Sequence, residues 1–308
     1  MDFDNQRMRM SRVPAVVCIA AIIIISLYSA YTVNGVIASN APPTVVFTLG
    51  TSDRDVTYCN SQTMDIYIPS VAATRPLPLA IFVHGGGLTS GDKADIPPVF
   101  LSTLASAGYA VVSVNYRLAP QYKFPAQIED LKCAIRYLRE NAQTYGVNGS
   151  EVFVFGTSAG GELVTIAALM GAHSVFDVGP YPSESSSVTA AVDMFGPTNL
   201  TSWASYSDTL RVFGNNQSDL LLASPTHYVA PNAPPILIVQ GVNDTQVPES
   251  QSIQLYNQLT AAGDQTQLIL VQNMGHMFVQ AGSQPIEPSL SQVAQDMVSF
   301  FETHGGGG

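Results

Sequence analysis

The sequence predicts an α/β fold built on a mostly parallel, doubly wound sheet. Two observations carry this prediction. From residue 44 onward, short apolar runs alternate with segments of helical periodicity. Several of these runs are apolar throughout, which is typical of strands covered on both faces. A length of 308 residues fits one large domain of this kind, which can bury a substantial core.

The predicted sheet begins with an antiparallel lead-in and continues as a parallel core. Lead-in strands are predicted at residues 44–49, 56–58 and 64–68. Apolar and polar residues alternate most clearly at Met64, Ile66 and Ile68. Because residues 40–63 have the pattern of strands and turns, no large N-terminal helical cap is predicted. Core strands follow at residues 79–83, 110–114, 152–155, 190–195, 236–239 and 267–271.

Helices are predicted between the core strands. They are expected at residues 97–107, 127–141, 251–261 and 290–303, with one more directly after the strand at 152–155. In the second of them, Ile128, Leu131 and Ile135 recur at the spacing of one helix face. Residues 171–187 hold two prolines and a serine-rich run, which predicts a loop. Residues 198–235 have two interpretations, a small lid over the carboxyl ends of the strands or a plain surface connection.

The first 38 residues are predicted to direct export. Three arginines among the first 12 residues precede an uncharged apolar run at residues 13–33, as in a signal peptide. Cleavage after Ala38 is one interpretation, and an uncleaved membrane anchor is the other, because about 20 apolar residues can span a bilayer. Both place the predicted domain, residues 39–304, outside the membrane, either secreted or held at the cell surface. Residues 305–308, four glycines, are predicted to be a flexible tail.

Charge and cysteine content narrow the set of partners. The net charge of −11 and a pI near 4.6 leave no basic patch to meet phosphates, so no nucleic acid is expected. No C-x-x-C pair or His/Cys cluster indicates a metal site, and no metal or cofactor is expected. Cys59 and Cys133 have two interpretations, a disulfide formed outside the cell or two unreactive thiols. The sequence does not predict the oligomeric state.

The motif with the clearest chemistry is Gly-Thr-Ser-Ala-Gly at residues 156–160. It follows an apolar strand and precedes a helical pattern, the context in which a sharp turn exposes a serine hydroxyl. Its glycines have a physical role, because Cβ atoms would crowd so tight a turn. Ser158 is therefore the candidate nucleophile. An ordinary strand-to-helix turn is the alternative interpretation.

A serine nucleophile needs a base to take its proton and a carboxylate to orient that base. Both are predicted in the required chain order, Asp244 after the strand at 236–239 and His276 after the last strand. Of the five histidines, only His276 combines a strand-end position, a neighbouring glycine and the right chain order after Ser158 and Asp244. Asp193 and Asp208 are weaker candidates for the acid. The first lies within a predicted strand, and the second lies in a polar loop with no strand before it.

The remaining requirement is a set of donors for the oxyanion of a tetrahedral intermediate. The run His84-Gly85-Gly86-Gly87 follows a predicted core strand, and glycines allow the backbone to approach a substrate closely. The predicted donors are backbone N–H groups of this glycine run, together with that of Ala159 at the start of the helix after Ser158. A flexible glycine loop is the alternative interpretation.

Taken together, these motifs resemble the α/β-hydrolase carboxylesterases and lipases, and most nearly a capless group. That group is related to hormone-sensitive-lipase-like esterases and to the BD-FAE (feruloyl/acetyl esterase-like) enzymes. The matching segments are residues 64–69, 84–93, 114–120, 124–126, 156–161, 195–198 and 275–276. The resemblance covers about residues 55–302 and implies Ser158 as nucleophile, His276 as base and Asp244 as its orienter. It further implies that the oxyanion donors are the backbone N–H groups of Gly86, Gly87 and Ala159. Position 162 holds Glu where the BD-FAE pattern commonly has His.

The resemblance implies a carboxylic ester hydrolase that works through an acyl-enzyme without a cofactor. It leaves the substrate open among short-chain acyl esters, feruloyl or acetyl esters, lipids and polyesters. A serine peptidase of the same fold is disfavoured, because such peptidases usually carry a propeller domain for which this chain has no room. A catalytically inactive binding protein is disfavoured because the candidate triad and glycine loop are intact.

Overall fold

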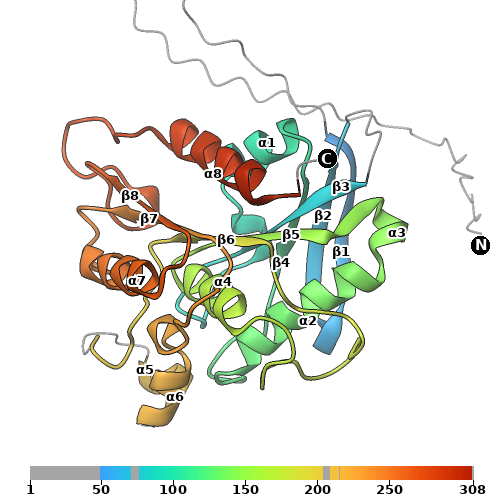
Figure 1. The fold of residues 1–308 in the computed structure, drawn as a ribbon, viewed down its shortest axis with the longest axis horizontal. Helices are drawn as coiled ribbons and strands as arrows, with labels where there is room; N and C mark the ends of the chain where they lie inside the picture. Colours follow the sequence, from blue (N-terminus) through green and yellow to red (C-terminus); the bar gives the residue numbers. More distant parts are fainter. Residues whose placement is uncertain (1–48, 71–75, 204–208, 215, 307–308) are drawn as a thin grey trace, which may run out of the picture. The chain divides into compact units, whose positions relative to one another are not determined.

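The computed structural model describes residues 49–70, 76–203, 209–214 and 216–306. These residues belong to one compact unit, Val45–Gly308. In this part of the chain eight strands form a single sheet in the order β1-β2-β4-β3-β5-β6-β7-β8 (Figure 1). Strand β2 pairs antiparallel with β1 and β4, and all the remaining neighbours pair in parallel. The predicted mostly parallel sheet with an antiparallel lead-in is confirmed.

The strand bounds agree with the sequence pattern in the core and differ in the lead-in. The strands are β1 (Leu49–Thr57), β2 (Thr63–Pro69), β3 (Leu77–Val83), β4 (Ala110–Val114), β5 (Val147–Thr157), β6 (Ala190–Met194), β7 (Ile236–Gly241) and β8 (Thr266–Val271). The predicted strand at 56–58 is the end of β1, while nearly all of the predicted strand at 44–49 lies outside the described residues. Strand β5 begins five residues before its apolar run, and a register shift against β3 follows Pro78.

Helices cover both faces of the sheet. They are α1 (Pro98–Ser106), α2 (Ala126–Glu140), α3 (Ala142–Tyr145), α4 (Ala159–Met170), α5 (Thr209–Phe213), α6 (Gln217–Leu222), α7 (Glu249–Ala262) and α8 (Leu290–His304). In Figure 1, α1 and α8 lie above the sheet, and α2, α4 and α7 lie below it. The sequence did not predict α3, α5 and α6, because their four to six residues are too few to display a helical period.

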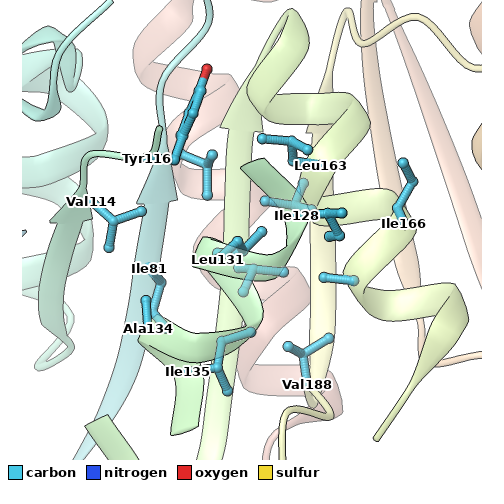
Figure 2. Close-up of a cluster of buried hydrophobic side chains, with 14 of the residues drawn as sticks. Ile81, Val114, Tyr116, Ile128, Leu131, Ala134, Ile135, Leu163, Ile166 and Val188 are labelled. Carbon is cyan, nitrogen blue, oxygen red and sulfur yellow. The ribbon is translucent and has the colours of Figure 1, made fainter. Parts of the chain in front are cut away.

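The core below the sheet fixes the helix that begins beside Ser158. Figure 2 shows side chains of α2 and α4 packed against β3 and β4. The predicted α2 face is confirmed, because Ile128, Leu131 and Ile135 are all fully buried. Burying each such side chain contributes about 1.5–3 kcal/mol. Leu163 and Ile166 bury the matching face of α4, so the start of this helix has a rigid support.

The connections after α4 are partly anchored by polar contacts. Residues 171–187 form a loop, as predicted, and the buried Lys132 and Arg136 of α2 bind it through Gly171 O and Asp177. Residues 198–235 contain α5, α6 and the short 3₁₀ helix η3 (Pro225–His227), which contacts α4 and α7. Because residues 204–208 and 215 are not described, the lid interpretation stays a prediction.

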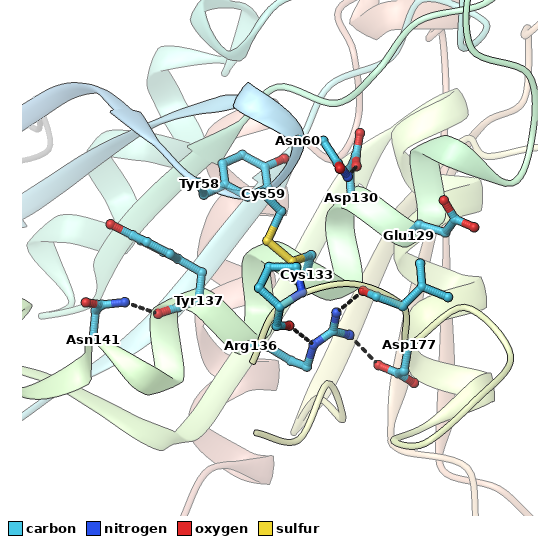
Figure 3. The surroundings of a disulfide bond; sticks show 12 residues. Tyr58, Cys59, Asn60, Glu129, Asp130, Cys133, Arg136, Tyr137, Asn141 and Asp177 are labelled. Atoms are coloured by element: carbon cyan, nitrogen blue, oxygen red, sulfur yellow. Dashed lines mark hydrogen bonds and ion pairs between the residues drawn. A yellow bond between two sulfur atoms is a disulfide. The ribbon is translucent and has the colours of Figure 1, made fainter. Parts of the chain in front are cut away.

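A disulfide joins the lead-in to the core. Cys59, in the 3₁₀ helix η1 (Cys59–Ser61), is bonded to Cys133 of α2, with the two Cα atoms 6.2 Å apart (Figure 3). Beside it, Asn60 Nδ2 donates to Asp130 Oδ1 over 2.7 Å. Of the two interpretations of these cysteines, the structure has the disulfide.

The predicted export segment, residues 1–38, lies outside the described residues. In the part of the chain that is described, no helix combines the length and the apolar character needed to cross a bilayer.

Candidate active site

Ser158 occupies a sharp turn between β5 and α4. Its backbone has φ 53° and ψ −122°, a strained conformation for a residue with a Cβ, and its N–H donates to Met194 O over 2.9 Å. The turn packs directly on the end of β3. A Cβ added at Gly160 would lie 2.0 Å from Val83 O, so only glycine fits there. This packing positions Ser158 at the carboxyl edge of the sheet.

The structure brings the three predicted side chains together at that edge. His276 Nε2 lies 2.9 Å from Ser158 Oγ, and His276 Nδ1 lies 2.7 Å from Asp244 Oδ2. The Asp244 side chain is fully buried and that of His276 is only 8% exposed. Ser158, Asp244 and His276 lie in the turn or loops that follow β5, β7 and β8. Because these strands are parallel, the segments that follow them meet at one edge of the sheet.

Backbone donors hold the Asp244 carboxylate in its orientation. The N–H groups of Gln246 and Val247 donate to its Oδ1 over 2.8 and 2.9 Å, which leaves Oδ2 facing His276. These two bonds fix the direction in which the carboxyl group points. Of the two weaker acid candidates, Asp193 lies inside β6, away from this arrangement, and Asp208 lies outside the described residues.

The glycine loop passes directly beside the nucleophile. A Cβ at Gly85 would lie 2.9 Å from Thr157 O and 3.1 Å from Ser158 Cβ. Gly86 and Gly87 have φ angles of +101° and +60°, conformations that favour glycine. The close approach explains why three glycines occur in succession at this place.

His84, which precedes the three glycines, supports this loop together with Tyr116. His84 is buried, burial lowers its pKa, and its ring stacks on that of Tyr116 with the centroids 4.2 Å apart. The Tyr116 hydroxyl donates to His84 O and Gly85 O over 3.0 and 3.2 Å. Within the described ranges, neither Gly86 N–H nor Gly87 N–H donates to a backbone carbonyl. The loop can therefore offer both groups to a ligand.

Aromatic packing fixes the loop that carries His276, and the sequence reasoning did not predict it. The Phe195 ring meets the His276 ring edge to face at 5.0 Å, and Phe278 packs on Phe195 at 4.8 Å and on Phe100 at 5.4 Å. Met277 and Phe278 both have positive φ, and this local backbone conformation accompanies the packing of the Phe278 ring on Phe195. These contacts join three segments far apart in the chain, so no local pattern indicates them.

Two buried carboxyl groups lie behind the Ser158 turn. Asp193 Oδ1 accepts a hydrogen bond from Gly196 N over 2.8 Å, whereas Asp193 Oδ2 and Glu162 Oε1 have no hydrogen-bond partner. Burial raises the pKa of Asp193 to about 7, although the Gly196 N–H and the Thr165 hydroxyl act in the opposite direction. Burial and the charge of Asp193 raise the pKa of Glu162 well above its ordinary value. The sequence indicated Glu162 only as a departure from the family pattern.

This pair predicts a pH-dependent stability. Because the folded-state pKa of Asp193 is raised from 3.8 to about 7, its contribution is fully present below pH 3.8 and is lost as the pH rises toward 7. Relative to Asp193→Asn, which cannot ionise, the unfolding free energy of the wild type should fall by up to about 1.4 kcal/mol per pH unit across this window. Urea denaturation of both proteins from pH 4 to pH 8 measures the difference. A constant difference would contradict the prediction.

Across the described ranges, no group of three or more His, Cys, Asp or Glu side chains is arranged to hold a metal ion. The candidate site is the Ser158–His276–Asp244 hydrogen-bonded line with the neighbouring glycine loop.

Known proteins are similar to this chain over most of its length. Residues 64–259 match the BD-FAE family. Esterase LipC of Mycobacterium tuberculosis is 30% identical over 230 residues, which are 71% of this chain and 57% of that protein. The chain spans about half the length of the curated relatives that it matches.

Two solved structures are similar over most of the chain. A truncated form of a carbohydrate esterase from gut microbiota has a TM-score of 0.73 and 30% identity, covering 83% of this chain and 97% of that one. A bifunctional GH43-CE protein of Bacteroides eggerthii has a TM-score of 0.71 and 28% identity, covering 83% of this chain and 38% of that one.

Proposed function

Because this chain belongs to the BD-FAE family and has the α/β-hydrolase fold, we propose that it is a serine ester hydrolase that forms an acyl-enzyme on Ser158. The observation that carries the proposal is the pair of hydrogen bonds that connects Ser158 to His276 and His276 to Asp244. A hydroxyl, an imidazole and a buried carboxylate in this order form a nucleophile, a base and an orienting group. Relatives named as esterases support the same reaction class.

The proposed reaction follows from the positions of these groups. Ser158 Oγ attacks the ester carbonyl carbon while His276 Nε2 takes the hydroxyl proton. The N–H groups of Gly86, Gly87 and Ala159 stabilise the oxyanion of the tetrahedral intermediate. His276 then gives the proton to the leaving alcohol, and Asp244 stabilises the imidazolium meanwhile. A water molecule attacks the acyl-enzyme in the same manner and releases the acid.

Acyl esters of carbohydrates are the substrates that we infer first. One similar solved protein is called a carbohydrate esterase, and residues 64–259 match the BD-FAE family, which is also the family that the motifs resemble. Acetyl or feruloyl groups on a sugar would fit the reaction, because both present an ester carbonyl to Ser158. Short-chain alkyl esters, lipids and polyesters are alternative outcomes of a substrate test.

We also propose that the protein is exported, either secreted or held at the surface by its N-terminal segment. The Cys59–Cys133 disulfide supports this, because disulfides form and persist mainly in oxidising compartments. The charged and apolar order of residues 1–38 supports the same destination.

The proposed function is tested with a fluorophosphonate, which phosphonylates activated serines. We expect one adduct, located at Ser158 by peptide mass spectrometry, and a parallel loss of p-nitrophenyl acetate hydrolysis. A panel of further substrates is then tested. It contains acetylated and feruloylated oligosaccharides, p-nitrophenyl esters of rising chain length, a polyester film and a peptide amide. Cleavage of the peptide alone would indicate a peptidase. No adduct and no hydrolysis would indicate an inactive hydrolase fold.

A further inference from the structure

We propose that Asp193 is a positioning residue for His276, acting through the Phe195–Gly196 turn. The inference rests on the proposed hydrolase function. It concerns a buried pair that touches neither the substrate carbonyl nor the hydrogen-bonded line of the candidate site.

The first step is the path from the carboxyl group to the histidine ring. Asp193 Oδ1 accepts a hydrogen bond from Gly196 N over 2.8 Å, immediately after Phe195. Phe195 has φ 48°, so its backbone is strained and needs support from its surroundings. Its ring then contacts the His276 ring at 5.0 Å. The Asp193 hydrogen bond therefore stabilises the backbone conformation that places the Phe195 ring against His276.

The second step is the tightness of the packing around this carboxyl. A Cβ at Gly161 would lie 2.2 Å from Asp193 Oδ1, and a Cβ at Gly196 would lie 2.4 Å from the same atom. The carboxyl is thus enclosed between the first turn of α4 and the turn after β6. A displacement of Asp193 would shift both the helix that begins beside Ser158 and the turn that carries Phe195.

The third step is the second carboxyl. Glu162 lies in the first turn of α4, is 2% exposed, and has one oxygen without a hydrogen-bond partner, as Asp193 has. Among the described residues, the charge that acts on Glu162 is that of Asp193, and the polar groups at Asp193 are Gly196 N–H and the Thr165 hydroxyl. In the part of the chain that the structure describes, no salt bridge links a cation to either carboxyl group. Two ionised carboxylates in so dry a place would repel each other, which would disturb the carboxyl group that holds the Phe195–Gly196 turn.

The test compares four variants by steady-state kinetics on p-nitrophenyl acetate, well below the unfolding temperature of each. Asp193→Ala and Phe195→Leu should lower kcat by about tenfold or more with KM little changed, because the base is misplaced and binding is not. Asp193→Asn keeps an acceptor for Gly196 N and should restore most of kcat. A folded Asp193→Ala variant with wild-type kcat would overturn the positioning role, and so would an Asn variant as slow as the Ala variant.

The fourth variant tests the contribution of Glu162. Glu162→Gln removes one of the two carboxyl groups and with it their repulsion, so the alkaline fall of kcat in the wild type should move to higher pH. An unchanged alkaline limb would overturn this contribution of Glu162. If instead the wild type cleaves no ester and takes up no fluorophosphonate, the proposed function fails. A normal wild type beside unimpaired variants means that only the positioning role fails.

Discussion

Replacing Ser158 with alanine is expected to lower kcat for ester cleavage by about 10⁴-fold or more, with little change in KM. The substitution removes the Ser158 hydroxyl oxygen, which lies 2.9 Å from His276 Nε2, so no acyl-enzyme can form. It adds no atom to the tight turn and leaves the backbone strain at this position unchanged. Steady-state kinetics on p-nitrophenyl acetate measure the effect, and circular dichroism shows whether the fold is kept.

The matched control is Ser102→Ala on α1. The Ser102 hydroxyl donates to Val99 O within its own helix, over 3.2 Å, so kcat should stay within about twofold of the wild type. A second check adds His276→Ala to the Ser158 variant. Because the two residues act as a unit, the double variant should be about as slow as the single one. A Ser158→Ala protein that kept a few per cent of wild-type kcat would rule out the acyl-enzyme mechanism.

The candidate site could be predicted from the sequence because its three residues follow core strands in a fixed order along the chain. Each of Ser158, Asp244 and His276 directly follows a predicted core strand, and parallel strands bring such loops to one edge of the sheet. The glycine loop was predictable for a similar reason. Residues 85–87 can adopt backbone conformations that other residues cannot, and the strand before them fixes where they lie.

The contacts that support the site could not be predicted in the same way. Phe195 meets His276 and Phe278 across segments that are about 80 residues apart in the chain, and no periodicity encodes that approach. Asp193 has the appearance of an isolated acid in an apolar strand until the first turn of α4 brings Glu162 beside it. The pairing of the two cysteines likewise depended on a tertiary distance that the sequence does not contain.

Removing the Cys59–Cys133 disulfide is expected to lower the free energy of unfolding by about 4 kcal/mol, since the bond closes a loop with a sequence separation of 74 residues. In the unfolded chain this link restricts the conformations that the loop can adopt, and its loss makes unfolding more favourable. The variant is the double substitution Cys59→Ser and Cys133→Ser, measured by urea denaturation at pH 7. The α2 side chains around it are otherwise unchanged, so the core in Figure 2 should persist.

Reduction of the wild type provides the control for the serine side chains. Wild-type protein in excess dithiothreitol should have the same reduced stability as the double variant, because both lack only the covalent link. The disulfide joins η1 to α2, whereas the candidate site lies in the loops after β5, β7 and β8, so kcat at 25 °C should be retained while inactivation by heat becomes faster. If oxidised wild type and double variant unfold at the same urea concentration, the link contributes no stability. Heat inactivation, measured without denaturant, also bears on the proposed export. A protein whose stability depends on this disulfide needs a compartment in which the disulfide stays oxidised.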